Sequence, residues 1–290
     1  MLVKFDYARC DSINDLLDVL SNSGKNIGLI AGGTDLLVQI RSKLVKPDAV
    51  ISIKDIPELT EIKETAHDIT VGAAVSFSEI IGSSVIHDNF PVLQDASGYI
   101  GSPIIRNLAT IGGNVQTASP AADGLAALYS LDAQVVLVSP RGERLLKIED
   151  FVIGPKKTAR AKDELIKAFR IPKIKWDMEK FFKVGKRNAL AISIVNGVVR
   201  AAFEDGRKIK EARVVLGAVA PTPLRLRQAE NFLQGKEYTD ELGKELRKII
   251  QDSISPISDI RASKEYRKYI AGVMCDRVIS DNLENGGGRS

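Results

Sequence analysis

The chain has 290 residues, of which 44% are hydrophobic and 27% are charged, and its net charge is +4. This length and composition exclude a disordered chain and allow two domains with separate cores. No apolar stretch is long enough to span a bilayer, and the first residues lack the basic and apolar regions of a signal peptide, so we expect a cytoplasmic protein. Two cysteines and two histidines are too few for a zinc site or an iron–sulfur cluster, so no metal ligands are predicted.

Positive charge is concentrated in the middle of the chain. Residues 141–187 hold 15 lysines and arginines against 7 aspartates and glutamates, which leaves the rest of the chain at −4. This stretch lacks the interleaved aromatic residues of a nucleic-acid groove, so we expect no nucleic-acid partner. An anionic cofactor or an acidic partner surface would fit it, although a solvated surface accounts for most of these residues.

The N-terminal elements follow from capping residues and apolar periodicity. Ser12 can cap a helix with one apolar face, and Ser76 and Glu79 have the spacing of a capping box. The expected elements are a helix over 12–22, strands over 49–53 and 69–73, and helices that begin at Ser76 and Pro91.

The most informative stretch of this region is residues 27–37. A short apolar run ends in Gly32 and Gly33, and a helix over residues 36–44 is expected to follow. Glycines let a ligand approach the bare backbone, and the first N–H groups of a helix are unpaired and partly positive. The turn therefore predicts a phosphate site, with a plain strand-to-helix turn as an equally weighted alternative.

Residues 98–123 lack helical or strand periodicity and are rich in Gly, Ser, Thr, Asn and Pro, which predicts a long loop. We expect the loop to be ordered, because its isoleucine, leucine and valine side chains would otherwise stay in water. Gly112 and Gly113 again permit close approach to the backbone, and Thr110, Asn114 and Thr117 add hydroxyl and amide groups.

The remaining elements alternate between strands and helices. Ser119 and Pro120 have the pattern of a cap and a first helical residue. The expected elements are a helix that runs to residue 131, strands over 133–138, 165–171, 192–203 and 209–219, a hairpin turn at Asp205–Gly206, and helices over 240–254 and 264–283.

Two glycine motifs stand in a fixed order with distinctive flanks. The first is Ala31-Gly-Gly-Thr-Asp35, and the second is Thr110-Ile-Gly-Gly-Asn114, preceded by Gly101-Ser-Pro103-x-x-Arg106-Asn107 and followed by Ala118-Ser-Pro120-x-x-Asp123. Together they resemble the FAD-binding medium subunit of the molybdenum hydroxylases, the family of xanthine dehydrogenase, carbon monoxide dehydrogenase and aldehyde oxidoreductases. The resemblance covers nearly the whole chain and extends past Lys183 and Arg187 to the segment 259–274.

The resemblance implies an α+β fold. Residues 1–175 would form an FAD-binding region of two α/β subdomains, of the vanillyl-alcohol-oxidase or PCMH type. Residues 176–282 would form a smaller C-terminal α/β domain with an antiparallel sheet and helices, and residues 283–290 a flexible tail.

The resemblance also implies the residues that bind FAD, and it implies no catalytic residue in this chain. The matching positions are Ile30, Ala31, Gly32, Gly33, Thr34, Asp35, Leu36, Thr110, Ile111, Gly112, Gly113, Asn114, Thr117, Asp123, Ile166 and Lys183. The two turns would clamp the diphosphate from both sides. Because a carboxylate repels phosphate, we expect the Asp35 side chain to cap backbone amides while its own N–H faces the cofactor.

Two of these positions, Lys183 and Ile166, each allow a second interpretation. Lys183 would stabilise the anionic reduced flavin, or it is one more exposed lysine, and Ile166 would lie near the flavin ring or simply in the core. Ala191 stands where relatives often have Asp, and Ile100 stands where xanthine dehydrogenases have an aromatic residue that stacks on adenine.

The implied function is electron transfer within a larger enzyme. In the family, a molybdopterin cofactor in a large subunit hydroxylates the substrate, two [2Fe–2S] clusters in a small subunit carry electrons, and FAD passes them to an acceptor such as NAD⁺. This chain lacks the cysteines for clusters, so the resemblance implies both partner chains, in a heterotrimer or a dimer of heterotrimers. An aldehyde is the default substrate by analogy, ahead of carbon monoxide and N-heterocycles.

Two other functions stay open at this point. A stand-alone flavin oxidase would oxidise a simple alcohol without partners, but it would need a cap domain larger than the C-terminal part of this chain. A non-catalytic assembly subunit would be colourless and would take up no FAD.

Overall fold

The structure is a computed structural model that describes residues 4–204 and 206–284. The chain forms two compact units, and each is built from segments that are not contiguous in sequence. The first unit comprises the chain up to Val85 together with residues 101–118 and 132–173, and the second comprises residues 86–100, 119–131 and the chain from Ile174. None of the helices in the described ranges is long and apolar enough to cross a membrane.

A three-stranded parallel sheet forms the N-terminal part of the first unit. Its strands are β1 (Asp6–Arg9), β2 (Ile27–Ile30) and β3 (Ala49–Ser52), in the order β1-β3-β2. Helix α1 (Ile13–Asn22) packs its apolar face into the same core as β3. The Ser12 hydroxyl accepts the N–H of Asp15 at 3.1 Å, which confirms the predicted cap. Helix α2 (Leu36–Arg41) is shorter than predicted, because Lys43 takes a left-handed conformation with φ of 59°.

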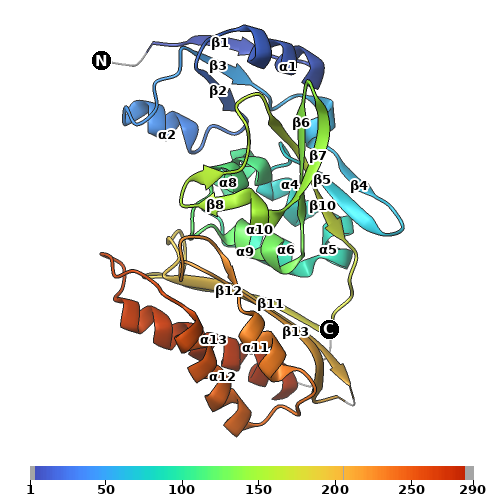
Figure 1. The fold of residues 1–290 in the computed structure, drawn as a ribbon, viewed down its shortest axis with the longest axis vertical. Coiled ribbons are helices and arrows are strands. Elements are labelled where there is room, and N and C mark those ends of the chain that lie inside the picture. The colour runs from blue at the N-terminus through green and yellow to red at the C-terminus, as the bar shows by residue number, and fades with distance from the viewer. Residues whose placement is uncertain (1–3, 205, 285–290) are drawn as a thin grey trace. The chain divides into compact units, whose positions relative to one another are not determined.

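A five-stranded antiparallel sheet forms the rest of the first unit, so the N-terminal region has the expected two parts (Figure 1). The sheet has the order β4-β5-β10-β6-β7, with β4 (Ile62–Glu64), β5 (Asp68–Gly72), β6 (Gln134–Ser139), β7 (Gly142–Lys147) and β10 (Leu165–Pro172). Shorter elements are α3 (Pro57–Thr60), α4 (Phe77–Gly82), α5 (Ser84–Asn89), α10 (Ile148–Phe151), β8 (Val152–Gly154) and β9 (Lys157–Thr158). Both bonds of the capping box between Ser76 and Glu79 are present.

The prediction of a long loop over residues 98–123 was wrong. Two short helices, α7 (Pro103–Leu108) and α8 (Ile111–Thr117), occupy half of it. Ser102 caps α7, and Pro103 is its first residue, so the serine–proline signal was genuine there. The apolar side chains of this segment are not all removed from water as expected, because Ile104 on α7 is 73% exposed.

The second serine–proline pair does not begin a helix. The Ser119 hydroxyl accepts the N–H of Ala121 in a local turn, and helix α9 (Asp123–Ser130) begins three residues after Pro120. The prediction of a cap at Ser119 was therefore wrong, while the end of the helix was predicted to within one residue.

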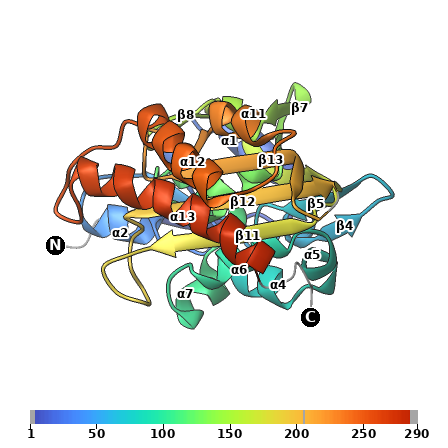
Figure 2. The same ribbon diagram turned by 90° about the horizontal axis from the view of Figure 1, so that it is seen from below.

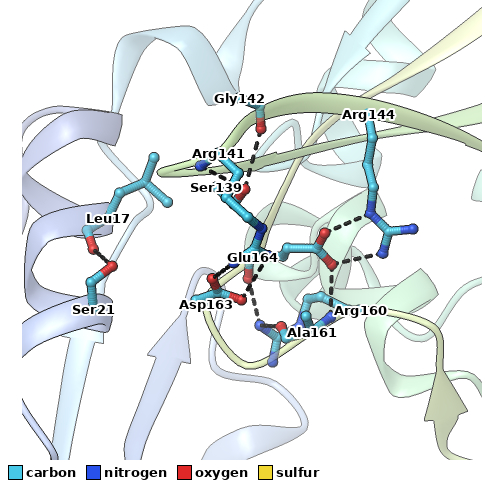
Figure 3. Close-up of polar contacts among 10 residues, drawn as sticks. All are labelled: Leu17, Ser21, Ser139, Arg141, Gly142, Arg144, Arg160, Ala161, Asp163 and Glu164. Atoms are coloured by element: carbon cyan, nitrogen blue, oxygen red, sulfur yellow. Dashed lines mark hydrogen bonds and ion pairs between the residues drawn. The ribbon is translucent and has the colours of Figure 1, made fainter.

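Three arginines of the basic middle stretch, Arg141, Arg144 and Arg160, make polar contacts within the first unit (Figure 3). The buried Glu164 carboxylate accepts Arg144 at 2.6 and 2.8 Å and the N–H of Ala161 at 2.7 Å. The hydrogen bond from Arg144 lowers the pKa of Glu164 although burial acts to raise it. Arg160 donates to the carbonyl of Glu164 and to Gln116 at 3.1 Å, which ties the loop before β10 to α8.

The second unit has an antiparallel sheet covered by helices on both faces (Figures 1 and 2). The sheet has the order β11-β12-β13-β14, with β11 (Met178–Val184), β12 (Val195–Glu204), β13 (Lys208–Gly217) and β14 (Leu224–Arg225). Helices α6 (Pro91–Gly98) and α9 cover one face, and α11 (Arg227–Leu233), α12 (Asp240–Ser253) and α13 (Lys264–Glu284) cover the other. The hairpin of β12 and β13 was predicted, and Asp205 in its expected turn lies outside the described residues.

Alternation along β12 decides which helices each side chain meets. Val195, Val199 and Ala201 belong to the core shared with α12 and α13. Asn196 and Arg200 point to the opposite face, where both bond groups of residues 121–130. A central strand covered on both faces reads as an apolar run, which hides its polar members from pattern analysis.

A network around Asp259 joins the loop before α13 to the sheet. Asp259 accepts Arg267 at 2.8 Å, and the buried Arg267 also donates to the carbonyls of Ile194 and Ala218. Burial acts to raise the pKa of Asp259, but the N–H of Arg261 and the guanidinium groups of Arg267 and Arg261 outweigh it and lower the pKa to about 2.

We therefore predict that Asp259→Asn lowers the free energy of unfolding by about 2 kcal/mol at pH 7. Because the folded-state pKa is depressed, this contribution is present above the unfolded-state pKa and is lost as the pH falls toward 2. Urea unfolding at a series of pH values measures both effects. Asp252→Asn, at an exposed aspartate of α12, is the control, and an equal loss in both variants would contradict the assignment.

Candidate functional site

The first glycine turn lies in the first unit, between the end of β2 and the start of α2. Gly33 has a φ of +70°, a left-handed conformation that favours glycine. Gly32 packs so tightly that a Cβ atom there would overlap the backbone carbonyl of Leu108, at the end of α7. The first motif therefore contacts the backbone that leads directly into the second motif.

The turn exposes backbone donors that the protein does not use. Within residues 4–204 and 206–284, the N–H groups of Gly32, Gly33, Thr34 and Asp35 donate to no acceptor. Successive N–H groups around a left-handed residue form a concave site for anions. Unused donors in a partly buried turn leave a free-energy cost that a bound anion would remove.

Asp35 does not act as the helix cap that the sequence predicted. Its side chain makes no capping bond to α2, and its Oδ2 accepts Gln39 Nε2 at 2.5 Å and Thr117 Oγ1 at 3.0 Å. The carboxylate therefore binds two side chains instead of backbone amides, and one of them belongs to α8. The Asp35 backbone N–H remains free within the described residues, as expected.

The second motif differs from the first in how its backbone is used. The N–H groups of Ile111 and Gly112 donate to the carbonyls of Val75 and Ala73, and those of Gly113 and Asn114 donate to Thr110. These four donors are therefore already paired, unlike those of the first turn. Among the described residues, the N–H of Thr110 is the one backbone donor of this motif that has no acceptor, and the clamp of a diphosphate from both sides stays a prediction.

The side chain of Asn114 also has an unused polar group. Its Oδ1 is buried and has no hydrogen-bond partner among the described residues. A buried polar atom without a partner is rare in folded proteins, and a missing ligand is one of its common causes. Free donors at the first turn and a free acceptor on α8 fit a bound molecule that carries both anionic and polar groups.

Asp123 and Lys183 lie together in the second unit. Lys183 Nζ bonds Asp123 Oδ2 at 2.6 Å and the carbonyl of Tyr99 at 3.1 Å, and the Lys183 side chain is only 9% exposed. Lys183 is therefore not the solvent-facing lysine of the alternative interpretation. Two residues that sequence reasoning missed, Ser193 and Asn196, complete the cluster through bonds to Asp123 Oδ1.

Apolar positions of the predicted site lie in the first unit. Ile30 ends β2, Leu36 begins α2, and Ile166 is buried in β10 opposite Leu137 of β6. The structure thus places the Ile166 side chain in the core of the five-stranded sheet. Its role near the flavin stays a prediction of the resemblance.

Two family models together match almost the whole chain. One, described as the FAD binding domain in molybdopterin dehydrogenase, matches residues 3–174. The other, described as the CO dehydrogenase flavoprotein C-terminal domain, matches residues 180–281. The chain is thus a flavoprotein of the molybdopterin dehydrogenase class.

Known relatives match this chain over nine-tenths of their length or more. The chain is 36% identical over 265 residues to the nicotinate dehydrogenase FAD-subunit of Eubacterium barkeri, covering 89% of this chain and 90% of that one. It is 30% identical over 292 residues to the xanthine dehydrogenase FAD-binding subunit of Escherichia coli O157:H7, covering 98% and 99%. A chain of the reconstituted CO dehydrogenase from Oligotropha carboxidovorans superposes with a TM-score of 0.92 at 29% identity, covering 100% of both. The chain belongs to the family of FAD-binding medium subunits of molybdenum hydroxylases, as its motifs indicated.

The contact between the motifs predicts unequal effects of adding a methyl group to their glycines. Gly32→Ala should lower the free energy of unfolding by about 3 kcal/mol, because the new Cβ overlaps backbone atoms that cannot move aside. Gly113→Ala should change it by less than about 1 kcal/mol, because its nearest neighbour is Thr110 Oγ1 at 3.1 Å and alanine favours the helix. Urea unfolding without added FAD tests the pair, and equal costs would contradict this packing.

Proposed function

We propose that the N–H groups of Gly32, Gly33, Thr34 and Asp35 bind the diphosphate of FAD. The observation that carries this proposal is that these N–H groups have no acceptor within the described residues, and the buried Asn114 Oδ1 likewise has no partner there. A diphosphate carries two negative charges, and an array of backbone N–H groups stabilises such an anion. Asn114 would supply an acceptor to a hydroxyl or N–H group of the cofactor and an amide donor to an oxygen.

The carboxylate of Asp35 would repel a nearby phosphate unless the carboxylate is turned away from it and held by hydrogen-bond donors. Its bonds to Gln39 and Thr117 supply such donors. The second motif would then act as a rigid support of the first, since the N–H groups of Ile111 and Gly112 hold the start of α8 to residues 73–75. Bound FAD would supply the electron acceptor, and this chain would bind and orient it.

The function proposed for the complex is electron transfer. FAD would receive electrons from [2Fe–2S] clusters of a small partner subunit and pass them to NAD or another acceptor, while a large molybdopterin subunit hydroxylates the substrate. The names of the relatives, which are subunits of dehydrogenases, support this division of labour. We also propose that the three subunits form a heterotrimer or a dimer of heterotrimers, and that this complex is cytoplasmic.

Aldehyde oxidation remains the default prediction for the whole enzyme. Two of the relatives are named for nicotinate and xanthine, which are N-heterocycles, and this supports an N-heterocycle as the second candidate. The substrate would be selected in the large subunit, so no residue of this chain distinguishes the two classes.

Purification of the complex from native cells tests this assignment. We expect the chain to be retained together with a large chain that contains molybdenum and a small chain that contains iron. Substrate-dependent bleaching of the flavin with aldehydes and with N-heterocycles then identifies the substrate class. A flavin-loaded chain that oxidises simple alcohols without partners would instead establish the stand-alone oxidase, and a chain that takes up no FAD would establish the assembly subunit.

Replacement of Asn114 should separate cofactor binding from folding. Asn114→Leu keeps the approximate shape but removes the unpaired buried oxygen, so the apo chain should be as stable as the original chain or more stable. The same change should raise the dissociation constant of FAD at least about tenfold, because the cofactor loses a hydrogen-bond partner. Urea unfolding and quenching of FAD fluorescence measure the two effects.

Gln116→Leu is the matched control, since it makes the same kind of change two residues further along α8. Its side chain is exposed and bonds Arg160 and Thr158. We expect it to leave FAD affinity within about twofold of the original value. Unchanged affinity in Asn114→Leu, or equal losses in both variants, would refute the assignment of Asn114.

A further inference from the structure

Two loops lie side by side at one end of the second unit. One comprises residues 185–192, between β11 and β12, and the other comprises residues 255–263, between α12 and α13 (Figure 2). Lys186 Nζ on the first loop donates to the carbonyl of Ile260 on the second at 2.6 Å. The second loop leads directly into α13, so both loops and the start of this helix belong to one region of the surface.

Exposed apolar and aromatic side chains gather in this region. Ile257 and Ile260 on the second loop are 73% and 90% exposed. Tyr266 and Tyr269 are also exposed, and because they are three residues apart they share one face of α13. A group of such side chains marks an interaction surface, whereas single ones are ordinary. We call the following set the apolar end of the second unit: Leu190, Ile192, Ile257, Ile260, Tyr266 and Tyr269.

The loop that carries the two isoleucines is held in place, so their exposure does not come from a loosely held backbone. Asp259 lies between them and accepts the N–H of Arg261 at 2.8 Å and the buried Arg267 at 2.8 Å. The Ser258 hydroxyl accepts the N–H of Lys264 at 2.9 Å, which ties the loop to the start of α13. A loop that is already ordered loses little conformational entropy when a partner covers it, so its apolar side chains are well placed for docking.

The first loop contains a strained residue. Leu190 has a φ of 56°, a left-handed conformation that is unfavourable for leucine, and its carbonyl accepts Arg187 Nη2 at 2.6 Å. Its side chain is more than half exposed, so burial within the chain does not offset this cost. Backbone strain of this kind is concentrated at functional surfaces, and it agrees with a contact that another molecule completes.

The same region is basic. Residues 185–192 and 257–269 hold six lysines and arginines against two acidic residues. Asp259 is one of the two and is already bound by two arginines, so Glu265 is the one exposed carboxylate of these two ranges. A second copy of this surface would bring like charges together, which disfavours a symmetric dimer. An acidic partner surface complements it.

We propose that the apolar end of the second unit docks onto a partner subunit, at a surface with apolar pockets for Ile257 and Ile260 and a rim of aspartate and glutamate. The proposal rests on the function proposed above, in which this chain works inside a complex with other subunits. Burial of the isoleucines and tyrosines supplies the affinity. The lysines and arginines around them pair with the acidic rim and select the orientation of the partner.

Removal of one isoleucine tests the apolar part of the proposal. Full-length chains with and without Ile260→Ser are purified with their partners from native cells, and dissociation of the complex on dilution is followed by analytical ultracentrifugation. Ile260→Ser should raise the dissociation constant at least about tenfold, because the complex loses the burial of an isoleucine. Ile153→Ser is the matched control, since Ile153 on β8 of the first unit is 63% exposed, and it should stay within about twofold of the original value.

Charge reversal and cross-linking test the acidic rim. Lys264→Glu should weaken the complex and also reduce its sensitivity to salt, because an attraction between the subunits that salt screens is replaced by a repulsion. A carbodiimide joins an ammonium group directly to a carboxylate that it contacts. Mass spectrometry of the treated complex should therefore find Lys264 or Lys268 linked to an aspartate or glutamate of a partner chain, and the linked peptide identifies which partner it is.

Other occupants of this surface are outcomes that overturn the proposal. One is a dimer of the isolated chain that Ile260→Ser abolishes, and another is flotation of the isolated chain with phosphatidylserine vesicles that the same change abolishes. If Ile260→Ser does not fold in thermal unfolding, Ile257→Ser decides in its place. A chain that assembles with neither a molybdenum-containing nor an iron-containing partner would overturn the proposed function itself. A normal complex whose dissociation constant is unchanged in the isoleucine variants would overturn only this inference.

Discussion

The contact of Gly32 with the backbone at Leu108 is the constraint on which the site in the first unit depends. Backbone can approach backbone this closely only where no side chain intervenes. The contact brings together two motifs that lie almost eighty residues apart, and the bond between Asp35 and Thr117 adds a second link. The position of the free N–H groups is thus set by tertiary packing as well as by the local turn.

The two glycine motifs differ in how their backbone N–H groups are used. The N–H groups of Ile111 and Gly112 in the second motif hold α8 against residues 73–75, while those of residues 32–35 in the first motif have no acceptor in the part of the chain that the structure describes. Unpaired N–H groups and an unpaired buried oxygen at Asn114 cost folding free energy in the empty protein. A ligand that satisfies them binds and stabilises the chain through the same contacts, so the occupied protein should resist unfolding better than the empty one.

Local signals in the sequence predicted much of this fold, and tertiary contacts account for what they missed. The caps at Ser12 and Ser76, the glycine turns and the antiparallel hairpin of the second unit depend on nearby residues, and the structure has them. Helices α7 and α8 were missed because six or seven residues are too few to show a helical period. Asp35 binds a residue 82 positions away, and Asn196 lies within an apolar strand, so neither partner could be found from spacing.

The arrangement of the second unit changes what counts as a domain in this chain. Its sheet is covered on one face by α6 and α9, which come from residues 86–100 and 119–131, far ahead of the sheet strands in sequence. A cut near residue 175 would therefore strip these helices from the sheet and leave apolar surface bare on both fragments. The C-terminal segment therefore does not make up the second unit by itself, because two of the helices that cover its sheet belong to the N-terminal half of the chain.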